Sequence, residues 1–116
     1  MRSTHLITVA ALALTAACGS STSPSGPGPS QVFMQGVAFN PATRTVSVGT
    51  TVTWLNQDGV AHTVTYSSGP GTAFSSGTVA AAGIYTHTFT AAGTYQYYCT
   101  IHGTPTTGMH ATIVVQ

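Results

Sequence analysis

The feature that most restricts the fold is a series of short segments in which apolar and polar residues alternate, each followed by a turn signal. These segments begin after Gln31 and cover residues 32–39, 45–48, 51–56, 62–66, 84–90, 94–99 and 111–115. Alternation sends successive side chains to opposite faces of a strand, so that one face can be buried. No run is long enough for several helices. About seven to eight strands at this spacing predict an all-β protein, a Greek-key β-sandwich.

The alternation is clear in residues 51–56. Val52 and Trp54 point to one face, and Thr51 and Thr53 point to the other. An Asp58-Gly59 turn signal follows this segment and precedes the next one. We therefore expect Val52 and Trp54 in the core of the sandwich.

The chain carries almost no charge. Its 116 residues include two Lys or Arg and one Asp or Glu, which are Arg2, Arg44 and Asp58. Binding to nucleic acid needs clustered Lys and Arg to displace counterions from phosphates, so this class of partner is excluded. Arg44 and Asp58 cancel once a leader containing Arg2 is removed, which leaves little long-range attraction for any partner.

Residues 1–17 are expected to be a lipoprotein signal peptide. Arg2 is followed by the apolar stretch 6–14, which is too short to span a bilayer, and then by small residues. The sequence LTAAC at residues 14–18 resembles the lipobox of bacterial lipoproteins, in which the cysteine becomes the lipid-modified N-terminus. Thr15 stands where that motif more often has Leu. An ordinary secretory signal cleaved near Ala17 is the alternative.

A tether is predicted after the cleavage site. Residues 19–30, GSSTSPSGPGPS, cannot bury a core, so residues 18–30 would be a lipidated cysteine and a Ser/Pro/Gly spacer. Residues 31–116 suffice for one domain. We expect an exported protein on the periplasmic side of the cell envelope, held to the membrane by lipid on Cys18. Cys99 then lacks a disulfide partner, and a metal would protect its thiol in an oxidising compartment.

Residues 98–109, YCTIHGTPTTGM, carry the chemistry. They offer the thiolate of Cys99, the imidazole of His102 and the thioether of Met109, a mixed set that suits copper cycling between Cu(I) and Cu(II). A blue-copper centre has two His and one Cys in a trigonal arrangement with a weak axial Met. His62, after the Asp58-Gly59 turn, would supply the second imidazole. Zinc is the alternative metal, but a thioether is a poor fourth ligand for it.

The chain resembles a plastocyanin-type cupredoxin over nearly all of residues 32–115. The matching pieces are Phe39-Asn40-Pro41, residues 49–56 (GTTVTWLN), His62, residues 74–77 (FSSG), residues 87–89 (HTF), residues 93–99 (GTYQYYC), His102 and Gly108-Met109. The resemblance implies a cupredoxin-like sandwich that binds one copper ion, with His62, Cys99 and His102 as equatorial ligands and Met109 as the axial one. His87 and His110 are not expected to bind copper.

Two features depart from the family pattern. Six residues separate His102 from Met109, more than in plastocyanin and amicyanin loops. Thr63 follows the first histidine ligand, where plastocyanins usually have an Asn that braces the cysteine-bearing loop. We expect the Thr63 hydroxyl to act as a brace with different geometry.

The expected function is single-electron transfer between redox partner proteins of the cell envelope, by a monomer. The ligand set leaves no open position for a substrate, and the family resemblance places the edge of His102 at the surface as the electron port. Ile101 and Pro105 would form an apolar docking patch around it. Copper carriage, storage or homeostasis is the alternative. An enzyme is not expected, because the chain lacks the His-x-His pairs that bind the further copper ions of multicopper oxidases and nitrite reductases.

Overall fold

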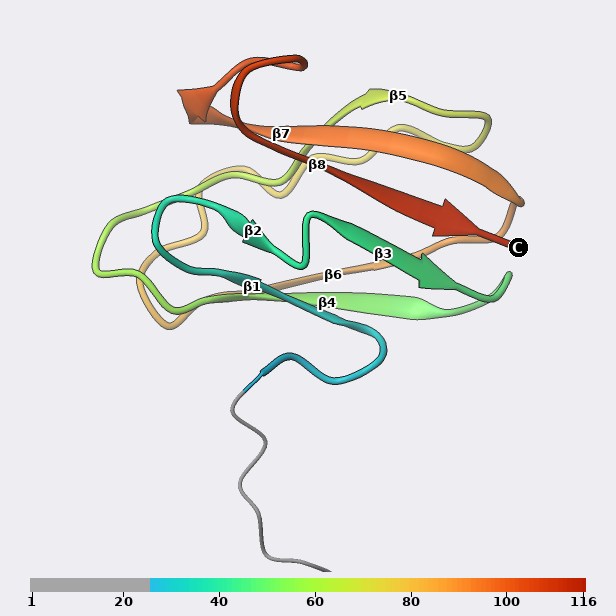
Figure 1. The fold of residues 1–116 in the computed structure, drawn as a ribbon, viewed down its shortest axis with the longest axis horizontal. Coiled ribbons are helices and arrows are strands. Elements are labelled where there is room, and N and C mark those ends of the chain that lie inside the picture. The colour runs from blue at the N-terminus through green and yellow to red at the C-terminus, as the bar shows by residue number, and fades with distance from the viewer. Residues whose placement is uncertain (1–25) are drawn as a thin grey trace, which may run out of the picture.

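In the computed structural model, two β-sheets pack face to face (Figure 1). The structure describes residues 26–116, so the predicted signal peptide, Cys18 and the first part of the tether lie outside the described residues. The strands of residues 26–116 are β1 (Gln31–Met34), β2 (Phe39–Asn40), β3 (Thr43–Val46), β4 (Thr51–Asn56), β5 (Thr65–Ser68), β6 (Ile84–Thr88), β7 (Gly93–Gly103) and β8 (Gly108–Val115).

The strand order is β2-β1-β4-β6 in one sheet and β3-β8-β7-β5 in the other. β1 runs parallel to β4, and β3 runs parallel to β8, while the other neighbours are antiparallel. Residues 26–116 contain no helix, and hence none able to cross a membrane. The prediction of an all-β sandwich is confirmed.

Aromatic side chains fill the space between the sheets. Trp54 on β4 lies at their centre, with its ring centroid 5.5 Å from Tyr97 on β7 and 6.3 Å from Phe89. Trp54 and Val52 are fully buried, as the alternation predicts. Edge-to-face and tilted aromatic pairs contribute about 0.5–1.5 kcal/mol each beyond the area they bury. The two sheets are thereby joined by close packing between β4 and β7.

The first predicted strand is in fact two strands. Residues 32–39 are interrupted at Gly36 and Val37, whose φ angles are 66° and 54°, and the Gln35 N–H donates to the Ala38 carbonyl at 2.9 Å. Two consecutive positive φ angles make a tight turn that twists with the strands it joins. The side-chain pattern did not reveal this break, because Val37 is a residue that rarely adopts a left-handed conformation.

The boundaries of β5, β7 and β8 also differ from the prediction, in the region of the predicted metal ligands. The fifth strand begins at Thr65, while His62 precedes it in a separate bridge with Val79. β7 continues past Cys99 to Gly103, and β8 begins at Gly108, so that most of the predicted ligand loop belongs to a β-hairpin. The backbone ladder therefore reaches further into the metal-binding region than the residue pattern indicates.

Candidate metal centre

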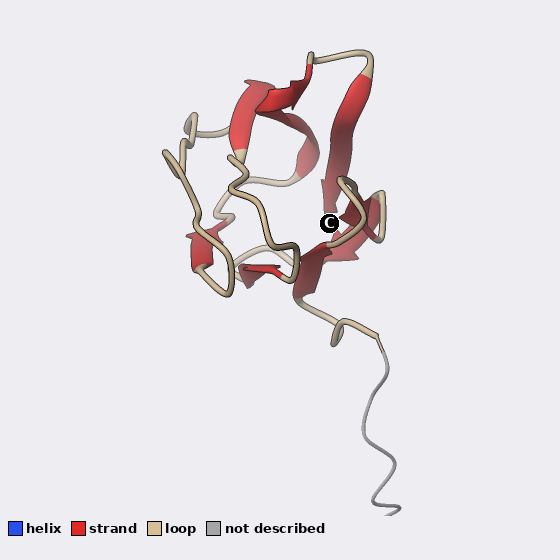
Figure 2. Cartoon of the chain, turned by 90° about the vertical axis from the view of Figure 1, so that its left-hand side faces the viewer, coloured by secondary structure: helices blue, strands red, loops and turns tan. Residues whose placement is uncertain are grey.

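His62, Cys99 and His102 converge at one end of the sandwich. His62 lies in the connection from β4 to β5, whereas Cys99 and His102 lie on β7. Figure 1 places this connection and the β7–β8 turn at the same end of the molecule, and Figure 2 faces that end. One ligand atom from each of the three residues lies within 4.8 Å of the other two. Segments 37 residues apart in the chain thus build one cluster.

The donor atoms have separations suited to a single ion. His62 Nδ1 and His102 Nδ1 are 3.1 Å apart, and Cys99 Sγ lies 3.9 Å and 3.6 Å from them respectively. Ligands about 2.0–2.3 Å from a first-row metal in a trigonal plane lie about 3.5–3.8 Å from each other, and the three separations lie within about 0.4 Å of that range. His62 and Cys99 are fully buried and His102 is partly exposed. The residues therefore fit a metal that prefers sulfur and nitrogen ligands.

The backbone and hydroxyl of Thr63 brace the cysteine. The Thr63 N–H donates to Cys99 Sγ at 3.3 Å, and its hydroxyl oxygen accepts the Thr100 N–H at 2.8 Å. The Thr65 hydroxyl donates in turn to the Thr63 hydroxyl at 3.1 Å. A hydrogen bond to a ligating sulfur influences the potential of the metal bound to it. Thr63 thus performs the bracing that the sequence predicted, through a short chain of hydroxyl groups.

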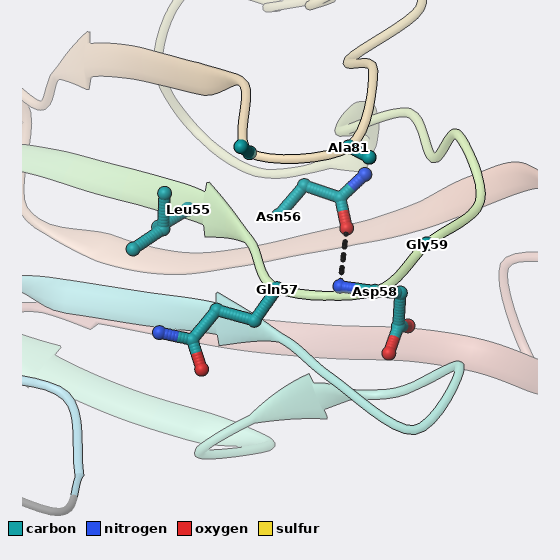
Figure 3. Close-up of a pocket in the computed structure, with 7 residues that line it drawn as sticks. Leu55, Asn56, Gln57, Asp58, Gly59 and Ala81 are labelled. Carbon is teal, nitrogen blue, oxygen red and sulfur yellow. Dashed lines mark hydrogen bonds between the residues drawn. The ribbon is translucent and has the colours of Figure 1, made fainter.

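Asp58 orients His62 from the side opposite to the cysteine. Its Oδ2 lies 2.7 Å from His62 Nε2, which turns Nδ1 of the same ring toward Cys99. Figure 3 shows the Asp58 carboxylate pointing away from Asn56, whose Oδ1 accepts the Asp58 N–H at 2.9 Å. Burial acts to raise the pKa of Asp58, but hydrogen bonds from Val37 N–H, His62 and Gly36 N–H lower that pKa below its usual value.

Sequence reasoning missed this contact. It treated Asp58 only as a turn residue, although the chain contains no other Asp or Glu and Asp58 precedes His62 by four residues. The isolation of one acid so close to a predicted ligand was the signal that could have identified it. Its other partners, Gly36 and Val37, are 21 to 22 residues away and carry no such signal.

A narrow hairpin brings the backbone of Met109 back beside Gly103, the residue after His102. Gly103 pairs with Gly108, and beyond this pair the Thr104 N–H donates to the Thr107 carbonyl at 2.9 Å. A Cβ on Gly108 would lie 2.6 Å from the His102 carbonyl oxygen, and one on Gly103 would lie 2.5 Å from Met109 N. Two glycines are therefore required for the strands to approach so closely. Met109, the second residue of β8, is buried, with 2% of its surface exposed.

The comparisons with known proteins agree with this site. Residues 30–116 match the family described as copper binding proteins, plastocyanin/azurin family. The chain belongs to this cupredoxin family. Its cofactor is one copper ion, and His62, Cys99 and His102 form the copper site. No curated protein matches the cupredoxin sequence.

Solved structures give the same family. A purple cupredoxin from Nitrosopumilus maritimus is 26% identical with a TM-score of 0.64, and the match covers 75% of this chain and 99% of that one. An amicyanin variant in its Cu(I) form is 32% identical with a TM-score of 0.64, covering 74% of this chain and 80% of that one. A copper-containing nitrite reductase from Thermus scotoductus SA-01 is 30% identical with a TM-score of 0.66 over 78% of this chain, but only 23% of its own.

Two other histidines of the cupredoxin lie away from these ligands. His87 on β6 packs with its ring centroid 4.6 Å from that of Phe74, and burial lowers the pKa of this imidazole. His110 is exposed on β8, opposite Tyr98.

A hollow of about 530 Å³ lies beside Asp58 and includes Leu55 in its lining, but none of the three copper ligands lines it (Figure 3).

Proposed function

We propose that the protein is a type 1 copper protein that carries single electrons between redox partners of the cell envelope. The observation that supports this most is a His/Cys/His ligand set, with His62 and Cys99 fully buried, that the sandwich itself holds in place. Copper bound there would supply the Cu(I)/Cu(II) couple. Because His62 and Cys99 are both fully buried, water and substrates have no path to the metal through them.

Two different segments hold the ligands against rearrangement. Cys99 and His102 lie on β7 between β5 and β8, and His62 is fixed by its bridge to Val79 and by Asp58. A ligand set that keeps one geometry in both oxidation states has little to reorganise when an electron arrives or leaves. This rigidity favours electron transfer over the ligand exchange that copper delivery requires.

Met109 is proposed as the axial ligand. It is buried, and the Gly103–Gly108 pair returns the chain so that Met109 N lies close to Gly103, next to His102. A thioether is a weak ligand that suits Cu(I), so its removal is expected to change the potential more than the retention of copper. Exchange of Met109 for Leu would test this by the shift in the EPR spectrum of the Cu(II) protein.

Electrons are proposed to pass through the edge of His102. It is the one member of the trio with exposed surface, and its neighbour Ile101 is 53% exposed. Pro105, at the tip of the hairpin, is exposed as well. Arg44 keeps its positive charge, but its guanidinium is directed to the Gln31 carbonyl of β1, to which it donates at 3.0–3.2 Å. An apolar contact with partner proteins, made by a monomer, is consistent with this surface.

Anchoring in the envelope is proposed from the sequence of residues 14–18 and the spacer after it. Growth of cells that express the full chain with labelled palmitate should label the wild type and leave Cys18→Ala unlabelled. A labelled Cys18→Ala protein, or an unlabelled wild type, would contradict lipidation at Cys18.

The copper function is tested on the purified full chain loaded with Cu(II). We expect one copper per chain, an intense thiolate charge-transfer band in the visible, and reversible one-electron reduction. Absence of the band or of reversible reduction would overturn the proposal. Rapid loss of copper to a competing copper-binding protein, together with slow electron exchange, would instead favour copper carriage.

Catalysis is not proposed, since the nitrite reductase matches over only a quarter of its length.

A further inference from the structure

We propose that Asp58 is a positioning residue for the copper site, which holds the proton of His62 on Nε2 and lowers the reduction potential of the bound copper. This inference rests on the proposed type 1 copper function. It assigns a role to the sole acidic side chain of the protein, which no part of the ligand motif requires.

Three nitrogen atoms converge on the Asp58 carboxylate. Oδ1 accepts the Gly36 N–H at 2.7 Å, and Oδ2 accepts the Val37 N–H at 2.9 Å. His62 Nε2 lies 2.7 Å from the same Oδ2. Short contacts of this kind are typical of charge-assisted hydrogen bonds. The carboxylate therefore connects the turn between β1 and β2 to the first copper ligand.

The geometry determines which nitrogen of His62 carries the proton. Backbone N–H groups only donate, so both carboxylate oxygens already act as acceptors, as the oxygens of an ionised carboxylate do. An ionised carboxylate has no proton to give, so the 2.7 Å contact requires a proton on His62 Nε2. Nδ1 is then the atom with a free lone pair, and it is the atom that faces Cys99 and His102.

The contact between Asp58 and His62 favours Cu(II) over Cu(I). A carboxylate that accepts the second N–H of a metal-bound imidazole raises the basicity of that ligand and adds negative charge near the ion. Both effects stabilise Cu(II) relative to Cu(I). Asp58 is mostly shielded from solvent, with 15% of its side chain exposed, and no second acid exists in the chain to replace it. Loss of this charge should therefore raise the reduction potential.

The turn that shares the carboxylate complicates a simple substitution. Val37 has a φ of 54°, a conformation that costs a residue with a Cβ roughly 1–2 kcal/mol. Asp58 offsets this cost by accepting the Val37 N–H. A change at Asp58 could thus act on the turn alone. Val37→Gly removes the steric cost, because glycine adopts positive φ readily, and leaves the hydrogen bond to His62 in place.

The first test compares Asp58→Asn with the wild type, in the full chain loaded with copper. Asn is nearly isosteric, but it is neutral and presents an NH2 group to N–H donors. We expect the visible band to persist and the Cu(I)/Cu(II) equilibrium to shift toward Cu(I) by at least tenfold, which is about 59 mV for one electron. The same shift is expected between Val37→Gly and the double variant. An unchanged potential in both comparisons would overturn the inference. A shift between the wild type and Asp58→Asn that is absent between Val37→Gly and the double variant would overturn it as well.

A second measurement needs no variant at position 58. In the diamagnetic Cu(I) protein, NMR of the imidazole nitrogens should show His62 Nε2 bearing a slowly exchanging proton, and His62 Nδ1 without one. A proton on His62 Nδ1, or none on Nε2, would overturn the inference even if Asp58→Asn fails to fold. A wild type without the intense visible band would overturn the copper function itself, and so the two failures are distinguishable.

Discussion

The two segments that supply copper ligands are built in different ways. Cys99, His102 and Met109 lie on or beside the β7–β8 hairpin, where backbone pairing runs from Gly93↔Val115 to Tyr98↔His110 and resumes at Gly103↔Gly108. His62 lies in an irregular connection, where one bridge to Val79 and the side chains of Asn56 and Asp58 take the place of a ladder. The hairpin needs particular backbone conformations, whereas the His62 segment needs particular side chains.

This difference suggests a division of roles. Backbone pairing tolerates many side chains, and the pairs on either side of Cys99 and Met109 hold these two residues in place. Side-chain hydrogen bonds are individually replaceable, so the His62 segment is the place where substitutions can adjust the metal without disturbing the sandwich. Substitutions in the hairpin should therefore mainly affect folding and retention of copper, and those around His62 should mainly affect the potential.

The largest effect is expected for Cys99→Ser. The hydroxyl of Ser is a poor ligand for copper, and without the sulfur no thiolate charge-transfer band can form. We expect loss of the visible colour and of most copper uptake, measured by absorbance and by metal analysis. Cys99 is fully buried and Ser is slightly smaller, so the apoprotein should still fold. Unchanged colour and metal content would show that the ligand assignment is wrong.

The next effect tests the backbone of the hairpin. Gly108→Ala places a Cβ 2.6 Å from the His102 carbonyl oxygen at a φ of +68°. We expect a loss of about 2–5 kcal/mol from left-handed strain and overpacking together, measured by urea unfolding of the apoprotein.

Gly77→Ala is the matched control for that substitution. Gly77 has a similar φ of +62°, but nothing lies within 4 Å of the position of its Cβ. It should therefore show only the conformational cost of about 1–2 kcal/mol, with normal copper binding. Equal losses in the two variants would mean that the close approach of Gly103 and Gly108 does not determine the stability of the hairpin.

Asn56→Ala tests the side-chain arrangement around His62. The Asn56 amide donates to the Val60 and Val79 carbonyls, and its Oδ1 accepts the Asp58 N–H. Its removal takes a partner from the partly buried Val60 carbonyl and Asp58 N–H, while the Val79 carbonyl keeps the His62 N–H, and we expect a cost of about 1–3 kcal/mol. We expect reduced stability by urea unfolding and a visible band that survives with a changed EPR spectrum. A normal spectrum would show that His62 is held without the Asn56 side chain.

The difference between the hairpin and the His62 segment also explains which parts of the site could be predicted from the sequence. Thiolate, imidazole and thioether groups have distinctive chemistry, so Cys99, His102 and His62 could be singled out by residue type and spacing. The sequence also shows Gly103 and Gly108 on either side of residues 104–107, but the six residues between His102 and Met109 were interpreted as a long loop and not as a paired hairpin. The lone acid four residues before His62 was a signal for their contact, but the two backbone N–H groups that hold its carboxylate come from the unpredicted turn at Gly36 and Val37.

The smallest effect is expected for Thr63→Val. The substitution keeps the backbone N–H that donates to Cys99 Sγ and removes the hydroxyl that accepts the Thr100 N–H. We expect a loss of about 1–2 kcal/mol and a small change of potential, measured by urea unfolding and by voltammetry. Thr65→Val removes only a donor to Thr63 and should have less effect on both. A larger effect of Thr65→Val than of Thr63→Val would show that the Thr63 hydroxyl is not the main brace of the Cys99 segment.

The pairing of Gly103 with Gly108 also has a consequence for how this region can be altered. The neck of the hairpin is closed by backbone contacts, and residues 104–107 form a small tip beyond it, held by hydrogen bonds of its own. The tip can therefore accept extra residues, or a covalently attached probe, while the ligands beneath it stay in register. It offers an attachment point for a dye or an electrode linker next to the exposed edge of His102.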